Sequence, residues 1–158
     1  MVRMRLKLSI LSLFALLFCT VASAQSVATG AKVRHIKPLS AKLTDGHYLY
    51  VGFVHSASEP CRLSTLHVCQ TLKERADIDH LFLSCEGQNL CQPWLQQLSA
   101  DGVNVVLNAS ALFKHCGIDY APFSMIVDHR YRVVWFGNPI VLNNQRIDKI
   151  LSQWISQR

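Results

Sequence analysis

Strand-like and helix-like segments alternate along this chain, and a short polar motif lies where the first strand gives way to the first helix. The apolar run 48–54 is rich in Tyr, Val and Phe and predicts a buried strand. Residues 62–75 place Leu, Val and Cys near the spacing of one buried helical face. Ser58-Glu59-Pro60-Cys61 lies between these two segments. Because a helix between strands is the usual crossover of a parallel sheet, this arrangement favours an α/β fold.

The same alternation continues to the end of the chain. We predict further strands over 80–83, 103–107, 123–127 and 132–136, and further helices that begin near Pro93, Ser110 and Asn143. The first strands, which helices separate, should pair in parallel, whereas the tight turn at 128–130 makes the last two strands a hairpin. The sequence therefore predicts a single α/β domain with a central mixed sheet flanked by helices.

Residues 1–24 have the features of a secretory signal peptide. A basic stretch, 3–7, precedes an uncharged apolar run, 8–22, and Ala22-Ser23-Ala24 is a small-residue cleavage site. The apolar run is shorter than the roughly 20 residues that span a bilayer. We expect cleavage before Gln25, no membrane span in the mature chain, and a periplasmic or secreted location in a bacterium. An uncleaved N-terminal anchor is the alternative.

The charge of the chain does not predict a nucleic-acid partner. Three of the 16 Lys and Arg residues belong to the signal peptide, and the remaining 13 are scattered and face 10 Asp and Glu. The one loose basic group precedes the first strand: Lys32, Arg34, Lys37 and Lys42. We therefore expect residues 25–45 to form a solvated N-terminal extension before a folded domain over 46–158. Weak attachment of this extension to an acidic partner or a membrane surface is the alternative.

Five cysteines follow the signal peptide, and an odd number leaves at least one thiol free or paired to another molecule. Cys85 and Cys91 bracket a short loop, and export permits disulfides, so we expect a local disulfide between them. Cys69 lies two helical turns beyond Cys61, about 12 Å along the helix axis, which is too far for pairing. We expect Cys69 to be a small core residue. Cys116 could pair with Cys61 or Cys69, or remain the extra thiol.

No metal or other cofactor is predicted. No two cysteines have the CxxC spacing of a zinc site. His55, His67 and His115 could join Cys61 in binding a soft metal such as copper, but we favour scattered, partly exposed histidines without a metal.

The motif and its surroundings resemble the thioredoxin fold, and most closely the exported TlpA/ResA-like branch of the thioredoxin-like superfamily. Residues 53–62 run in step with that family's strand end, Trp, Cys-x-Pro-Cys motif and following Arg. Ala57 occupies the position of the Trp, and Ser58 that of the first cysteine, whereas Cys61 matches the second. The resemblance therefore implies a thioredoxin-like domain whose redox motif has lost one thiol.

A second segment carries the same resemblance. Residues 116–128 are similar to the part of the family that contains its cis-proline, which would be Pro122, and 132–137 to the last strand with its terminal glycine. A proline cannot donate to a sheet, so Pro122 should lie at the start of its strand, and an X-Pro bond is the usual place for a cis peptide. Ser58, Cys61 and Pro122 are accordingly the candidate site.

Ordinary dithiol–disulfide turnover is not expected of this motif. In the family, one thiol attacks a disulfide and a second thiol releases the mixed disulfide. Ser58 supplies neither thiol, and its hydroxyl is not a usable nucleophile without an adjacent base. Cys61 is near a helix N-terminus and a cation, Arg62, which favour the thiolate. A buried and inert Cys61 is the equal alternative.

Three functions remain open. The first is envelope thiol–disulfide chemistry, in which Cys61 holds an envelope protein partner through a mixed disulfide. The second is a non-enzymatic binding or assembly module of an envelope secretion or conjugation machine. The third is peroxide reduction, because Ser58 precedes Cys61 by three residues as in peroxiredoxins, although Val54 stands where that family has a proline.

Overall fold

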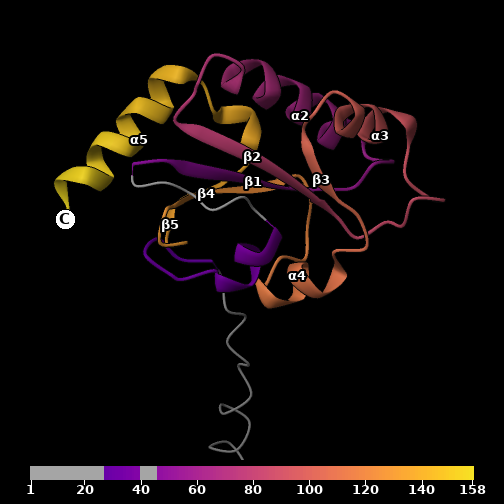
Figure 1. Cartoon of the computed structure of the whole chain (residues 1–158), viewed down its shortest axis with the longest axis horizontal. Helices are drawn as coiled ribbons and strands as arrows, with labels where there is room; N and C mark the ends of the chain where they lie inside the picture. The colour runs from indigo at the N-terminus through magenta and orange to yellow at the C-terminus, as the bar shows by residue number, and fades with distance from the viewer. Residues whose placement is uncertain (1–26, 40–45) are drawn as a thin grey trace, which may run out of the picture.

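The computed structural model describes residues 27–39 and 46–158. Within these ranges five strands form one mixed sheet in the order β3-β2-β1-β4-β5 (Figure 1). The strands are β1 (Tyr48–Val54), β2 (Ile78–Ser84), β3 (Asn104–Val106), β4 (Phe123–Asp128) and β5 (Val133–Gly137). β1 and β3 run parallel to β2, whereas β4 runs antiparallel to both β1 and β5. The predicted mixed sheet with a closing hairpin is confirmed.

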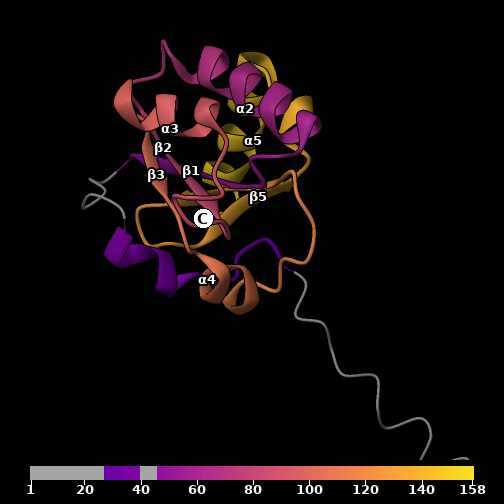
Figure 2. The same ribbon diagram turned by 90° about the vertical axis from the view of Figure 1, so that its right-hand side faces the viewer.

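Helices cover both faces of the sheet. They are α2 (Glu59–Leu72), α3 (Pro93–Ala100), α4 (Ser110–His115) and α5 (Asn144–Ser156), with two 3-10 helices, η1 (Arg34–Leu39) and η2 (Pro139–Val141). Figure 1 and Figure 2 show α2, α3 and α5 on one face, and α4 with η1 on the other. The predicted cap of the last helix is confirmed, since the Asn143 side chain accepts a hydrogen bond from the Arg146 N–H at 2.8 Å.

The central strand β1 is buried along its whole length because helices lie on both sides of it. Its side chains alternate between two apolar clusters: Leu49, Val51 and Phe53 face α4 and η1, whereas Tyr48, Tyr50 and Val54 face α2, α3 and α5. Gly52 lies among the second set and packs flat against the Phe82 ring, where a Cβ atom would lie only 2.6 Å from Cδ1 of Phe82.

Gly52→Ala should therefore lower the free energy of unfolding by about 1–3 kcal/mol, as overpacking of a tight core does. Urea denaturation followed by circular dichroism measures the loss. Phe82→Leu in the Gly52→Ala background should recover part of it, because the smaller side chain makes room. A Gly52→Ala variant as stable as the parent would contradict this close contact.

The described part of the N-terminal extension is exposed along most of its length, but it is anchored to the folded domain. Val27 and Ile36 are buried in the cluster beneath α4, and the Gly30 N–H donates to the Val133 carbonyl at 2.7 Å. The backbone of Lys32 forms an isolated antiparallel β-bridge with that of Arg132, just before β5. Val27 and Ile36 thus add to one face of the core, while the basic side chains Lys32, Arg34 and Lys37 are exposed. The predicted signal peptide, 1–24, and Lys42 lie outside the described residues.

No helix within the described ranges is long and apolar enough to cross a membrane.

Candidate functional site

The polar motif builds the N-terminus of α2. Ser58 is the N-cap residue, with extended backbone, and its Oγ accepts from the Cys61 N–H at 3.4 Å. Pro60 lies in the first turn, where the helix needs no N–H donor. Serine is among the best N-cap residues, so the Ser58 side chain has a structural role in starting this helix.

Cys61 is completely buried. Its exposed fraction is 0%, and its Sγ accepts from the backbone N–H of His55 at 3.4 Å. The guanidinium of Arg62 does not serve this sulfur, because it is held by Glu59 through contacts of 2.8 and 2.5 Å. The sequence left open whether Cys61 is reactive or buried, and in the structure it is buried.

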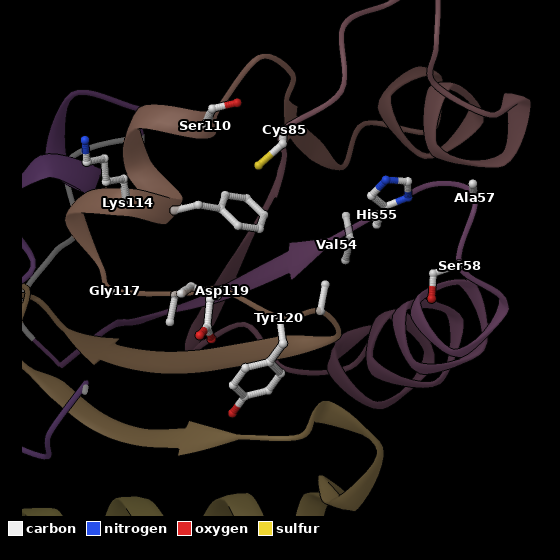
Figure 3. Close-up of a pocket in the computed structure, with 13 residues that line it drawn as sticks. Val54, His55, Ala57, Ser58, Cys85, Ser110, Lys114, Gly117, Asp119 and Tyr120 are labelled. Atoms are coloured by element: carbon white, nitrogen blue, oxygen red, sulfur yellow. The ribbon is translucent and has the colours of Figure 1, made fainter. Parts of the chain in front are cut away.

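The Ala121–Pro122 peptide bond is cis, as predicted, and lies just before β4. Ala121 borders a groove of about 900 Å³ that also reaches Ser58. The start of α2 and the segment before β4, both singled out in the sequence, therefore meet at one site. The groove is lined by Val54, His55, Ala57, Ser58, Cys85, Ser110, Phe113, Lys114 and residues 117–121. In Figure 3, Cys85 and Ser110 lie on one side of it, and Asp119 and Tyr120 on the other.

Aromatic rings support the walls of this groove. The buried ring of Phe53 packs edge-on against Phe113 and Phe123, at centroid distances of 5.0 and 6.0 Å. Tyr120 packs edge-on against Phe123 at 5.4 Å and leaves 59% of its surface exposed. Rings that are fixed by the core and partly exposed give an apolar wall for a ligand to pack against.

Glu86 anchors the end of the groove, a role that the sequence analysis missed. Its carboxylate accepts from the N–H and Oγ of Ser56, at 2.5 and 2.8 Å, and from Oγ of Ser84 at 2.9 Å. It also lies 3.4 Å from Nδ1 of His55. Burial alone would raise the pKa of Glu86, but the hydrogen bonds from Ser56 and Ser84 and the nearby His55 outweigh it and lower the pKa.

A signal for this cluster is present in the sequence. Glu86 follows β2, and Ser56 follows β1, at the carboxyl ends of two parallel neighbouring strands. In open α/β sheets, such ends meet at one edge and carry the functional side chains. The register Val54↔Ser84 then brings residues 55–56 and 85–86 together.

The predicted Cys85–Cys91 disulfide is not formed in the structure, where all five cysteines of the described residues are free thiols. Cys85 is exposed and faces the groove on the α4 side. Cys91 is buried in the cluster on the α3 side, beside Leu95 and Val105. Spacing alone suggested pairing, but the Cys85 thiol is exposed at the groove, whereas the Cys91 thiol is buried.

Burial disfavours the thiolate form of two further cysteines. Burial raises the pKa of Cys69 and of Cys116 to about 11. Cys116 lies in the core beneath α4, whereas Cys61 and Cys69 lie on the side of α2. The sheet thus separates Cys116 from both of the partners proposed for it from sequence. Cys69 is half-buried and packs against the core, as expected.

The histidines do not gather into a metal site. His67 Nε2 lies 2.6 Å from the Leu142 carbonyl, and His115 Nδ1 lies 2.6 Å from that of Ala111. His115 also stacks on His35, with ring centroids 4.3 Å apart. Among the residues that the structure describes, no group of three or more His, Cys, Asp and Glu side chains could hold a metal ion.

Neither a protein-family model nor a curated protein sequence matches this chain. Solved structures do match it. A thioredoxin-like protein from Parabacteroides distasonis superposes with a TM-score of 0.59 at 13% identity, over 80% of this chain and 96% of that one. StoA from Bacillus subtilis gives a TM-score of 0.53 at 13% identity, over 68% of this chain and 84% of that one.

The exposed lipoprotein thioredoxin of Streptococcus pneumoniae gives a TM-score of 0.54 at 18% identity, over 68% of this chain and 86% of that one. Sequence identities this low support a shared fold, but they do not support a shared function. The strand order, the cis-proline before β4 and these superpositions agree, and this chain has the thioredoxin-like fold.

Proposed function

We propose that this protein is an exported thioredoxin-fold module that binds an extended segment of an envelope protein in the groove beside Ala121. The observation that carries the proposal is the contrast between an open groove and a closed motif. The groove at the end of α2 is accessible, whereas Cys61 is 0% exposed and Ser58 caps the helix. Dithiol turnover needs two accessible thiols, whereas Ser58 has none and the Cys61 thiol is buried. We therefore favour a binding function for the groove.

The backbone of Ala121 suits a peptide ligand. Within the described residues, neither its N–H nor its C=O takes part in a hydrogen bond, although it borders the groove. Unpaired backbone groups beside a groove are what an extended peptide pairs with when it adds to a protein as a strand. Phe113, Ile118 and Tyr120 supply apolar contacts, and Lys114 and Asp119 supply charges of both signs at its rim.

The signal-like residues 1–24 support an export route. The likeness to a pneumococcal protein named an exposed lipoprotein thioredoxin is consistent with a location outside the cytoplasm. Peroxide reduction has less support, because a peroxide would have to reach the buried sulfur of Cys61. The mass of the protein isolated from a periplasmic fraction tests export, since cleavage before Gln25 leaves residues 25–158.

Tyr120→Ala should weaken peptide binding at least tenfold, because an exposed tyrosine in a groove is a typical binding hot spot. The probe is a library of fluorescein-labelled octapeptides in which apolar and polar residues alternate, and binding is read by fluorescence anisotropy. Ile155→Ala is the matched control, since Ile155 is 62% exposed, as Tyr120 is 59% exposed, but lies on α5 away from the groove.

Nuclear magnetic resonance places the bound peptide independently. The Ala121 amide signal should shift on addition of the best octapeptide and exchange with solvent more slowly, because the N–H gains an acceptor. Signal shifts that map to α5 instead, or equal losses of affinity in Tyr120→Ala and Ile155→Ala, would contradict peptide binding in this groove.

A further inference from the structure

We propose that the groove captures its partner covalently, and that the capturing thiol is Cys85, at the end of β2, in place of the motif cysteine on α2. The inference rests on the proposed function, because the partner must first lie in the groove. It adds the chemistry of that partner: an extended segment that carries a disulfide-bonded cysteine.

Exposure separates Cys85 from every other cysteine that the structure describes. Cys61 is 0% exposed, Cys91 and Cys116 are each 7% exposed, and Cys69 is half-buried against the core. Cys85 alone among these five is exposed, and it lines the same groove as Ser58 and Ala121. A disulfide that a bound partner segment brings into the groove would therefore contact the Cys85 thiol.

The backbone on both sides of Cys85 is fixed, so the thiol is held toward the groove. Ser84 is fully buried, and its carbonyl accepts from the Ala109 N–H at 2.8 Å. The carbonyl of Glu86 accepts from the Asn108 N–H at 2.9 Å, and its carboxylate is bound by Ser56 and Ser84. Cys85 directly follows the last residue of β2, is exposed and lines the groove. Figure 3 shows the Cys85 sulfur directed into the groove.

The proposed step is one thiol–disulfide exchange. The Cys85 thiolate attacks one sulfur of the partner's disulfide, forms a Cys85–partner disulfide and releases the partner's second sulfur as a thiolate, which takes up a proton from water. One disulfide breaks and one forms, so no further oxidant is needed. Cys61, Cys91 and Cys116 are buried and Cys69 is half-buried against the core, so no second thiol among the described residues is available to release the adduct. It persists until an external thiol attacks it.

The test uses mature protein, residues 25–158, and two probes. One is the best octapeptide from the binding library with a single central cysteine, carried as its disulfide with 5-thio-2-nitrobenzoate; the other is glutathione disulfide. We expect one peptide per protein, on Cys85 by tryptic mass spectrometry. The peptide should react at least tenfold faster than the same peptide with its apolar residues replaced by serine. Tyr120→Ala should slow adduct formation with the peptide at least tenfold, and adduct formation with glutathione disulfide by less than threefold.

Matched variants separate this inference from the proposed function. Cys85→Ser should abolish the adduct yet keep the affinity for the cysteine-free octapeptide within twofold, whereas Cys69→Ser should leave the adduct unchanged. An adduct on any cysteine other than Cys85, equal rates for the two peptides, or a Cys85–Cys91 disulfide in the protein as isolated overturns covalent capture. Failure of the cysteine-free octapeptide to bind overturns the groove function instead.

Discussion

In the native protein, the Cys61 thiol should react with iodoacetamide at least about 1,000-fold more slowly than in the urea-unfolded chain. Its sulfur lies in the apolar cluster beneath α2 with an exposed fraction of 0%. The reagent can therefore reach it only when the start of α2 opens or the whole domain unfolds. Because folded domains open in this way with free energies of several kcal/mol, the protection factor should be large.

Timed alkylation followed by residue-resolved mass spectrometry measures this protection. Cys85 is the internal control, since it is exposed in the same molecules and should react in native protein at close to its unfolded rate. Cys69, half-buried and with a pKa raised by burial to about 11, should lie between the two. If Cys61 were alkylated as fast as Cys85, a mixed disulfide at the motif would again be the better hypothesis, and the binding proposal would lose its main support.

The sheet and its connections could be predicted because they depend on local patterns. Apolar runs, a proline in a helical first turn and Asn143 before an amphipathic helix each specify an element without reference to the rest of the fold. Pro122 could be located for the same reason, since a proline cannot occupy a paired position within a strand. Residues 27–39 escaped prediction, because they have no period and are ordered by contacts with residues about 100 positions further along the chain.

The chemistry of the site was harder to predict than its position. Ser58 and Cys61 indicated the place of the site, but the exposure of Cys61 depends on how the apolar cluster beneath α2 packs around its sulfur, which no spacing encodes. The Cys85–Cys91 disulfide is not formed because a count of intervening residues does not say which side chain is buried: Cys85 is exposed at the groove, whereas Cys91 is buried. Glu86 was missed because two of its partners, His55 and Ser56, lie 30 or more positions earlier in the chain, just after the neighbouring strand β1.

The buried carboxylate of Asp128 should make the largest single electrostatic contribution to stability, at the opposite end of β4 from the cis-proline. It accepts from the N–H groups of Arg130 and Arg132, at 2.9 and 3.0 Å, and from Nε of Arg132 at 2.9 Å. It also pairs with Arg158. The Arg132 and Arg158 guanidiniums lie 5.3 and 5.4 Å from the Trp154 ring centroid, so the cluster ties α5 to the β4–β5 turn.

Burial alone would raise the pKa of Asp128, but hydrogen bonds from Arg132 and Arg130 and the Arg132 charge outweigh it and lower the pKa. Its folded-state pKa therefore lies below its unfolded-state pKa of about 4. The stabilisation is fully present above that unfolded value and disappears as the pH falls through the folded-state pKa. Stability should accordingly decline in acid, and Asp128 should account for part of that decline.

Asp128→Asn should lower the free energy of unfolding by about 3 kcal/mol at pH 7, because it removes a buried charge that accepts hydrogen bonds from Arg130 and Arg132 and leaves the half-buried Arg132 and the exposed Arg158 without their carboxylate. Urea denaturation at pH 7, 5 and 3 measures the effect, with Asp101→Asn as the exposed control, which should change stability by less than about 0.5 kcal/mol. The parent and Asp128→Asn should converge toward pH 3, since protonation then removes the same charge that the substitution removes. A difference that stays constant from pH 7 to pH 3 would mean that the substitution acts through packing, and that the charge of Asp128 does not stabilise this end of the sheet.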